Sequence, residues 1–199
     1  MITFKKREII YRPYEIVVKT IVDVIVIICI AFLTVTFFFD NTTITGHSMN
    51  DTLNHTDVML VNKAVFKFRN PDRYDIVVFE PNIGNVSDYY IKRIIGLPGE
   101  TVQIIDGKVY IDGKVLEDDV IKMEIYNAGN AAEPITLGYN EYFVLGDNRN
   151  NSDDSRFSNV GLVKSDSIIG MPWFVIYPFE DFGGIDAVEM KEETEEATK

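Results

Sequence analysis

The 199-residue sequence predicts a mainly β protein: an N-terminal single transmembrane helix, then a β-rich domain with a small inserted β-meander subdomain. Three observations predict this fold class. A long apolar segment lies near the N-terminus, short apolar runs bounded by turn residues follow from residue 57, and two Asp-Gly pairs separate neighbouring runs. The composition, with 46% hydrophobic and 25% charged residues, is typical of a folded chain.

The apolar segment covers residues 21–39, and Asp23 is its only charged residue. A helix of this length extends about 28 Å, close to the roughly 30 Å hydrocarbon thickness of a bilayer. A cleaved signal peptide has a shorter apolar region that ends in small residues. A buried core helix has a polar face, which this segment lacks. We therefore expect a retained transmembrane helix over residues 21–39.

Charge is distributed unevenly along the chain. Residues 1–20 contain five basic and two acidic residues, whereas the whole chain has a net charge of -12. Basic residues before a transmembrane helix favour a cytoplasmic N-terminus, so we expect a single-pass protein of the cell membrane with residues 1–20 inside and the β-rich domain outside. The acidic remainder argues against nucleic-acid binding.

Cysteine and histidine are too few for several kinds of site. Cys29 is the only cysteine and lies within the predicted helix, which excludes a disulfide framework, a multi-thiolate zinc site and a cysteine nucleophile acting outside the membrane. With only two histidines, a three-histidine metal centre is also excluded.

The β-rich domain is expected over residues 40–179, after a polar loop at 41–55. Its inserted subdomain is expected at about 101–140, where Asp106-Gly107 and Asp112-Gly113 supply the positive φ angles of tight hairpin turns. Residues 180–199 are rich in acidic residues and are expected to form a solvated, disordered tail. The predicted strands are 58–62, 76–79, 89–95, 102–105, 108–111, 142–145 and 168–177.

Ser48 lies in a polar loop and is a candidate nucleophile if a base lies close to it in the fold. His47 is adjacent in sequence, so its side chain diverges from that of Ser48, and His55 has no orienting aspartate in an evident motif. Lys92 is the stronger candidate, because strand alternation places it between Tyr90 and Ile94. Burial among apolar groups lowers a lysine pKa by several units and permits proton abstraction.

A third polar cluster, at residues 146–156, directly follows a predicted strand. Its short polar side chains suit a calcium loop, but the closing Glu of an EF-hand is absent. Hydroxyls and an Asp-Arg pair at the end of a strand are better suited to orienting a neighbouring base.

Together with the predicted helix, these clusters resemble the type I signal peptidases of bacteria, membrane-bound serine proteases that use a Ser/Lys dyad. SMNDTL at residues 48–53 is similar to the nucleophile motif, and RYDIVVF at 73–79 to a second motif. KRIIGLPGE at 92–100 is similar to the general-base motif. GDNR and SDDSR within 146–156 are similar to the last motif, and the resemblance covers about residues 5–178 in order.

This resemblance implies Ser48 as the nucleophile and Lys92 as the general base of an acyl-enzyme mechanism, with Ser152 orienting the Lys92 amine. It implies that Asp154 and Arg156 brace that loop by an ion pair. It further implies exported preproteins as substrates, cleaved after a small residue with another small residue at P3, and neither a cofactor nor a metal. The residues implied as structural supports are Arg93, Asp147 and Arg149.

Three residues depart from the family pattern. Asp51 replaces a proline, Tyr74 replaces a glycine, and Glu100 replaces an aspartate. In some relatives a serine two positions before the nucleophile helps to stabilise the oxyanion; here Gly46 occupies that position, so the Ser48 N–H is expected to carry most of that role.

One membrane contact and two other functions stay open at this point. Met49, with Trp173 and Phe174, is a candidate for contact with membrane lipid, core packing being the alternative for the two aromatic residues. A Ser/Lys self-cleaving repressor protease would need a DNA-binding domain in place of the predicted helix. A catalytically impaired membrane-anchored β-domain that binds exported polypeptides is the alternative from another class.

Overall fold

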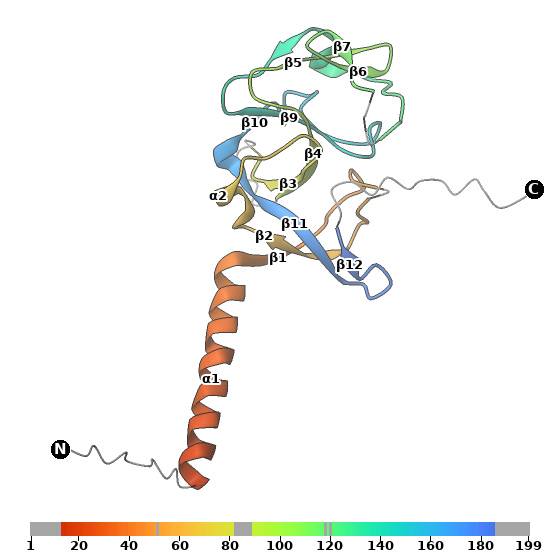
Figure 1. The fold of residues 1–199 in the computed structure, drawn as a ribbon. Helices are drawn as coiled ribbons and strands as arrows, with labels where there is room; N and C mark the ends of the chain where they lie inside the picture. The colour runs from red at the N-terminus through yellow and green to blue at the C-terminus, as the bar shows by residue number, and fades with distance from the viewer. Residues whose placement is uncertain (1–12, 51, 82–88, 118, 120, 186–199) are drawn as a thin grey trace, which may run out of the picture. The chain divides into compact units, whose positions relative to one another are not determined.

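A computed structural model of the chain describes residues 13–50, 52–81, 89–117, 119 and 121–185. The chain divides into two compact units, residues 1–38 and 39–199. The predicted fold class is confirmed: one apolar N-terminal helix precedes a unit built mostly of β-strands in a curled sheet (Figure 1). Residues 1–12 and 186–199, most of the predicted cytoplasmic segment and acidic tail, lie outside the described residues.

The helix α1 spans Pro13–Phe38, and its Tyr14–Phe38 portion is long and apolar enough to cross a membrane. It begins eight residues before the predicted span, because proline suits a first helical position and the following residues continue an apolar sequence. Its threonine hydroxyls donate to carbonyls four residues earlier, so they need no water. These bonds join Thr20 to Ile16 at 3.0 Å, Thr34 to Ile30 at 2.8 Å and Thr36 to Phe32 at 2.8 Å.

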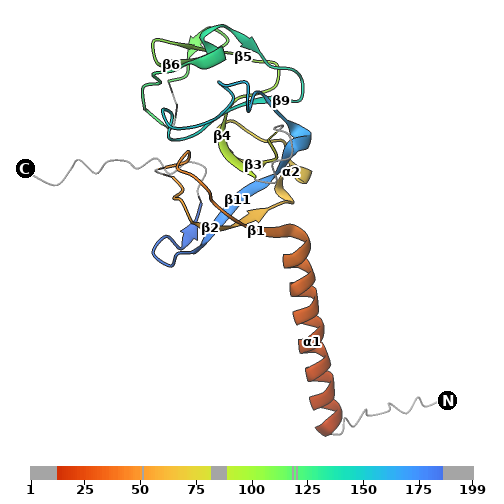
Figure 2. The same cartoon turned by 180° about the vertical axis from the view of Figure 1, so that it is seen from behind.

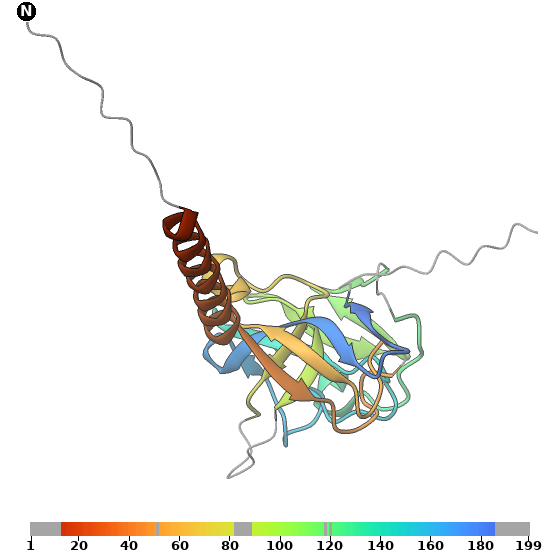
Figure 3. The ribbon, with the colours of Figure 1, turned by 90° about the horizontal axis from the view of Figure 1, so that it is seen from below.

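The main sheet of the second unit has eight strands in the order β1-β2-β11-β3-β4-β9-β10, with β12 paired to β11. Its strands are β1 (Phe39–Thr43), β2 (Val58–Asn62), β3 (Ile76–Phe79), β4 (Tyr90–Gly96), β9 (Glu141–Leu145), β10 (Val163–Lys164), β11 (Ile168–Tyr177) and β12 (Gly183–Gly184). All of these pairs are antiparallel. Figure 3 shows the long blue β11 alongside the orange β2.

A smaller four-stranded sheet, in the order β7-β6-β5-β8, forms the inserted subdomain (Figure 2). Its strands are β5 (Thr101–Ile105), β6 (Lys108–Ile111), β7 (Lys114–Val115) and β8 (Ile135–Thr136). The two Asp-Gly turns have φ angles of 48° and 74° at Asp106-Gly107, and of 50° and 75° at Asp112-Gly113. These are the positive φ angles expected for tight hairpins, so the predicted meander is present.

Several short elements differ from the sequence prediction. Residues 41–43, expected in a loop, belong to β1, whose polar sequence FDNTT forms a strand because it pairs along its whole length with β2. The strands β7, β8, β10 and β12 have two residues each and carry no periodic signal. The remaining elements are α2 (Val65–Phe68) and the 3-10 helices at Gly129–Ala132 and Ser165–Ser167.

The core of the second unit forms three apolar clusters, and β3 contributes to two of them. Ile76 and Val78 lie in one cluster, while Val77 and Phe79 lie in another, so β3 is covered on both faces. The third cluster lies between β9 and the smaller sheet and includes Val102 and Phe143. Because β4 pairs with β3 and β9, it is held at the centre of this core.

Gly96, the last residue of β4, has no room for a side chain. A Cβ there would lie 2.5 Å from Val102 Cγ2, 2.9 Å from Leu137 Cδ1 and 3.0 Å from Phe143 Cβ. We expect Gly96→Ala to reduce the free energy of unfolding by about 1–3 kcal/mol through overpacking, measured by urea unfolding of the full chain in detergent. Gly183→Ala is the control, because no atom lies within 4 Å of a Cβ there. Equal effects of the two substitutions would contradict this explanation.

Candidate active site

Ser48 lies in a loop between β1 and β2, which we call the Ser48 loop (residues 44–57). Two backbone hydrogen bonds close its base: Ile44 N–H donates to the Asp57 carbonyl at 2.8 Å, and Thr56 N–H donates to the Ile44 carbonyl at 3.0 Å. Met49 and Leu53 are each 2% exposed and anchor the loop in the core. Backbone hydrogen bonds and two buried side chains therefore hold the loop that carries Ser48.

The burial of Met49 contradicts the expected contact of this residue with lipid. It follows Ser48 directly, and its side chain turns inward to pack in the core cluster of β2 and β3. Trp173, in contrast, is 49% exposed, and its ring stacks on Phe39 with centroids 5.3 Å apart. Phe174 is half-buried and contacts Trp173 edge to face.

Lys92 lies in the middle of β4, opposite Val77 of β3, and is 3% exposed. Its Nζ donates to Ser48 Oγ at 2.9 Å and to the Ile91 carbonyl at 3.0 Å. The Tyr90 ring lies beside the amine, with its centroid 5.3 Å from Nζ. The fold thus brings together two residues that are 44 positions apart in sequence.

Burial lowers the pKa of the Lys92 amine from 10.5 to about 8. Nearby carboxylates oppose this effect: Asp154, then Asp153 and Asp147, raise the pKa by favouring the ammonium form. Desolvation is the larger effect, because among the described residues no carboxylate forms an ion pair with this amine. The amine therefore reaches a range in which its neutral form is populated near neutral pH.

Ser152 lies close to Ser48 across Gly146. A Cβ on Gly146 would lie 2.1 Å from Ser152 Oγ and 2.5 Å from the Ser48 carbonyl oxygen, so only glycine allows this approach. Ser152 Oγ is buried and has no hydrogen-bond partner in the described part of the chain. The Lys92 amine donates to Ser48 and Ile91 instead of Ser152, so the implied Ser152–Lys92 hydrogen bond is not formed in this arrangement.

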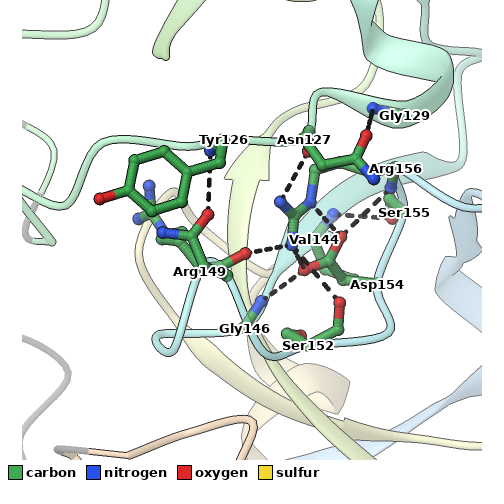
Figure 4. Close-up of polar contacts among 11 residues, drawn as sticks. Tyr126, Asn127, Gly129, Val144, Gly146, Arg149, Ser152, Asp154, Ser155 and Arg156 are labelled. Carbon is green, nitrogen blue, oxygen red and sulfur yellow. Dashed lines mark hydrogen bonds and ion pairs between the residues drawn. The ribbon is translucent and has the colours of Figure 1, made fainter.

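Asp154 and Arg156 form a buried ion pair next to Ser152 (Figure 4). Arg156 donates to Asp154 through Nε at 2.7 Å and Nη2 at 2.8 Å, while Asp154 Oδ2 accepts the Gly146 N–H at 3.1 Å. Arg156 also donates to the carbonyls of Arg149 and Asn127. The pair thus connects the start and the end of the 146–156 cluster to the inserted subdomain.

A second buried ion pair joins β4 to the same cluster. Arg93 donates to Asp147 through Nε at 2.8 Å and Nη2 at 2.7 Å. Asp147 Oδ2, which accepts the Arg93 Nη2 bond, also accepts Thr52 Oγ1–H at 2.5 Å, so the Ser48 loop is attached to the same aspartate. The Asn148 backbone N–H also joins the 146–156 cluster to the Ser48 loop, because it donates to the Ser48 carbonyl at 3.0 Å.

Arg149 is 1% exposed, and its partner Asp119 is a residue that sequence reasoning missed. The two Arg149 Nη atoms donate to the Asp119 oxygens at 2.6 Å each. Asp119 lies in the polar insertion, and no motif marks it. A buried arginine after a strand indicates that an acidic partner exists, but it does not indicate where in the sequence that partner lies.

The two histidines do not act on Ser48 in this arrangement. Ser48 Oγ is bonded to Lys92, and His55 Nδ1 accepts the Gly46 N–H at 3.0 Å. The His47 and His55 rings lie beside each other, with centroids 5.2 Å apart. Among the described residues there is also no group of three or more His, Cys, Asp or Glu side chains that can hold a metal ion.

Two of the three departures from the family pattern have a structural explanation. Tyr74 has a φ angle of 73°, in the left-handed region where glycine is the usual residue. Glu100 pairs with Arg73 and accepts the Leu97 N–H at 2.8 Å, so a carboxylate still closes this turn. Asp51 lies outside the described residues.

Ser48 and Ser152 both line an open cleft of about 830 Å³. Thr42, Thr43 and Thr45 line it from the β1 segment. Tyr89 and Tyr90 line it from the start of β4. The serine that contacts the buried amine is therefore accessible from this cleft.

Comparison with known proteins gives one consistent family. The family model described as signal peptidase, peptidase S26, matches residues 17–177. The signal peptidase I of Bacillus amyloliquefaciens is 36% identical over 171 residues, covering 79% of this chain and 84% of that protein. The signal peptidase I T of Bacillus subtilis is 35% identical over 165 residues, with the same two coverages.

A crystal structure of a signal peptidase I from Enterococcus faecalis is 36% identical and covers 52% of this chain and 97% of that chain, with a TM-score of 0.42. The family match extends over most of the chain and includes all the segments that form the site. The chain therefore belongs to the signal peptidase family of serine peptidases, peptidase S26.

Proposed function

We propose that this membrane-anchored peptidase removes signal peptides from exported preproteins, with Ser48 as nucleophile and Lys92 as general base. Membership of the signal peptidase family supports the reaction and the substrate class. The observation that carries the assignment of residues is the 2.9 Å contact between the buried Lys92 amine and Ser48 Oγ. A base within hydrogen-bond reach of a hydroxyl is the minimum geometry for an activated serine.

Acylation begins when neutral Lys92 takes the hydroxyl proton of Ser48 and Oγ attacks the scissile carbonyl carbon. The tetrahedral intermediate collapses as the C–N bond breaks, and the Lys92 ammonium gives its proton to the leaving amine. Ser48 is left as an ester of the signal peptide. The Ile91 carbonyl holds one hydrogen of the amine, which keeps Nζ directed at Oγ throughout this step.

Deacylation repeats the proton transfers with water. Lys92 takes a proton from the water molecule that attacks the ester, the bond to Ser48 Oγ breaks, and Oγ recovers its proton from Lys92. The Ser48 backbone N–H stabilises the oxyanion in both steps, because Gly46 offers no side-chain donor. Asp154, Arg156, Asp147, Arg93 and Arg149 hold the surrounding segments in place and take no part in proton transfer.

An extended substrate suits the cleft. Among the described residues β1 pairs only with β2, so its other edge has free backbone groups, and Thr42 and Thr43 line the cleft. A peptide segment that adds to this edge satisfies these groups and leads its backbone toward Ser48. This mode of binding depends on main-chain atoms and so accepts many different preproteins.

The proposed arrangement in the cell follows from charge. We propose that the basic N-terminal segment lies in the cytoplasm, that α1 crosses the membrane, and that the second unit, from Phe39, forms the peptidase domain outside. The acidic tail predicted over residues 180–199 is wrong for its first part, because Gly183–Gly184 form β12 and pair with β11. Preproteins emerge on the outer side of the membrane, so this topology places Ser48 on the side where their signal peptides are cleaved.

Loss of either dyad residue is expected to reduce kcat for preprotein cleavage by about 10³-fold or more. The substitutions are Ser48→Ala and Lys92→Met, the latter keeping an unbranched apolar side chain without the amine. Lys164→Met is the control, since Lys164 is an exposed strand lysine and should be replaceable without effect. Undiminished cleavage by Ser48→Ala or Lys92→Met would refute the dyad, and an inactive wild type would favour the alternative of a polypeptide-binding domain.

The acid side of the pH profile should report the Lys92 amine. Only its neutral form accepts the Ser48 proton, and its pKa is about 8, so kcat/KM should rise about tenfold per pH unit below this pKa and level off above it. Because Asp153 raises this pKa, Asp153→Asn should move the acid limb to lower pH. A profile that is independent of pH between about 6 and 9, or a midpoint near that of an ordinary lysine, is incompatible with the proposal.

Ser152 is proposed to provide a third partner for the amine by rotation of its buried, unpartnered hydroxyl. We expect Ser152→Ala to lower kcat by about tenfold without lowering the midpoint of thermal unfolding, because this hydroxyl has no hydrogen-bond partner among the described residues. Ser158→Ala, which changes an exposed serine near the same cluster, should keep full activity. Wild-type turnover by Ser152→Ala would remove this residue from the mechanism.

A further inference from the structure

His55 forms a hydrogen bond to the backbone of Gly46, two residues before Ser48. It lies on the returning side of the Ser48 loop, and its Nδ1 accepts the Gly46 N–H at 3.0 Å. The hydrogen bonds at Ile44, described above, close the loop below this level, so the His55–Gly46 bond crosses the loop between its base and Ser48. An acceptor at Nδ1 carries no proton, so the neutral ring has its proton on Nε2.

Gly46 needs such a restraint more than its neighbours do. Its φ angle is 106°, and no atom lies within 4 Å of the position that a Cβ would occupy. No side chain from elsewhere in the described chain therefore packs where a Cβ would lie, and glycine has the greatest backbone freedom of any residue. The hydrogen bond to His55 is the contact that fixes this peptide among the described residues.

The peptide that joins His47 to Ser48 is fixed from the other side. Its carbonyl accepts Asn148 Nδ2–H at 3.1 Å, and the next carbonyl, that of Ser48, accepts the Asn148 backbone N–H at 3.0 Å. The N–H of this same peptide is the proposed oxyanion donor. Asn148 and His55 thus restrain the two ends of the three-residue segment 46–48.

We propose that His55 is a positioning residue that sets the direction of the Ser48 N–H and Oγ through its hydrogen bond to Gly46. The role rests on the proposed function, in which Ser48 is the nucleophile. His55 makes no proton transfer, because Ser48 Oγ is bonded to Lys92 rather than to an imidazole. The His47 ring lies beside the His55 ring, with an angle of 53° between the two ring planes.

The test uses two substitutions of similar size that differ in the acceptor. In His55→Asn the amide oxygen stands as many bonds from Cα as Nδ1 does and can accept the Gly46 N–H, whereas His55→Leu places a methyl group there. Steady-state cleavage of a preprotein is measured with the full chain in detergent, together with thermal unfolding. We expect His55→Leu to lose about tenfold or more in kcat with KM and the unfolding midpoint unchanged, and His55→Asn to stay within about threefold of wild type.

Two results would overturn this role: wild-type kcat in His55→Leu, or equal losses in His55→Asn and His55→Leu. If His55→Leu lowers the unfolding midpoint, the concentration of folded enzyme is determined by labelling Ser48 with a serine-acylating reagent. The rate of cleavage is then divided by this concentration, so unfolded molecules are not counted. Ser48→Ala is measured in parallel. Cleavage by Ser48→Ala defeats the proposed function itself, whereas an inactive Ser48→Ala with a fully active His55→Leu defeats only the positioning role.

Discussion

The burial of the Lys92 amine, with no carboxylate ion pair in the described part of the chain, is the constraint on which the site depends. Lys92 and Arg93 are consecutive and almost equally buried, at 3% and 2% exposed. Arg93 donates two hydrogen bonds to Asp147, whereas among the described residues the Lys92 amine donates to a hydroxyl and a carbonyl and forms no ion pair with a carboxylate. A depression of its pKa from 10.5 to about 8 corresponds to roughly 3 kcal/mol in favour of the neutral amine. One strand therefore presents an arginine paired with an aspartate on one face and a buried amine of lowered pKa on the other.

The buried arginines explain how three distant segments keep the site geometry. Arg93 ties β4 to Asp147 and, through Thr52, to the Ser48 loop. Arg156 pairs with Asp154 within the 146–156 cluster and donates to the Asn127 carbonyl of the inserted subdomain. Arg149 donates to Asp119 in the same subdomain. Removing one partner of such a pair leaves an uncompensated buried charge and typically costs about 3–5 kcal/mol. These pairs stabilise one arrangement of the loops rather than adding to the chemistry.

The elements that the sequence predicted well are those whose burial leaves a periodic apolar pattern. The strands β2, β3, β6 and β11 have the predicted bounds, because each is an apolar run ended by turn residues. β1 was missed, since its polar sequence forms a strand only through pairing with β2. Met49 was wrongly expected at the surface, because a methionine in a polar loop gives no local sign that its side chain turns into the core.

The residues of the candidate site also divide into those that the sequence predicts and those that only the structure reveals. Ser48 and Lys92 were predicted from their positions in a polar loop and an apolar strand, and Ser152 from the family resemblance. Asp119 and the role proposed for His55 depend on contacts that span the loops and leave no spacing pattern. Tyr74 shows a further limit: its positive φ angle explains why relatives have glycine there, but only the backbone geometry reveals it.

The pKa of the Lys92 side chain, measured directly, tests the central claim most closely. The full chain with isotope-labelled lysine, held in detergent, is titrated while the NMR signals of the side chain are followed, and Lys92→Met identifies the resonance. We expect a midpoint at about 8 for Lys92, well below the ordinary lysine value of about 10.4. A midpoint near 10.4, the ordinary value for lysine, would contradict it, because the base would then be protonated at neutral pH.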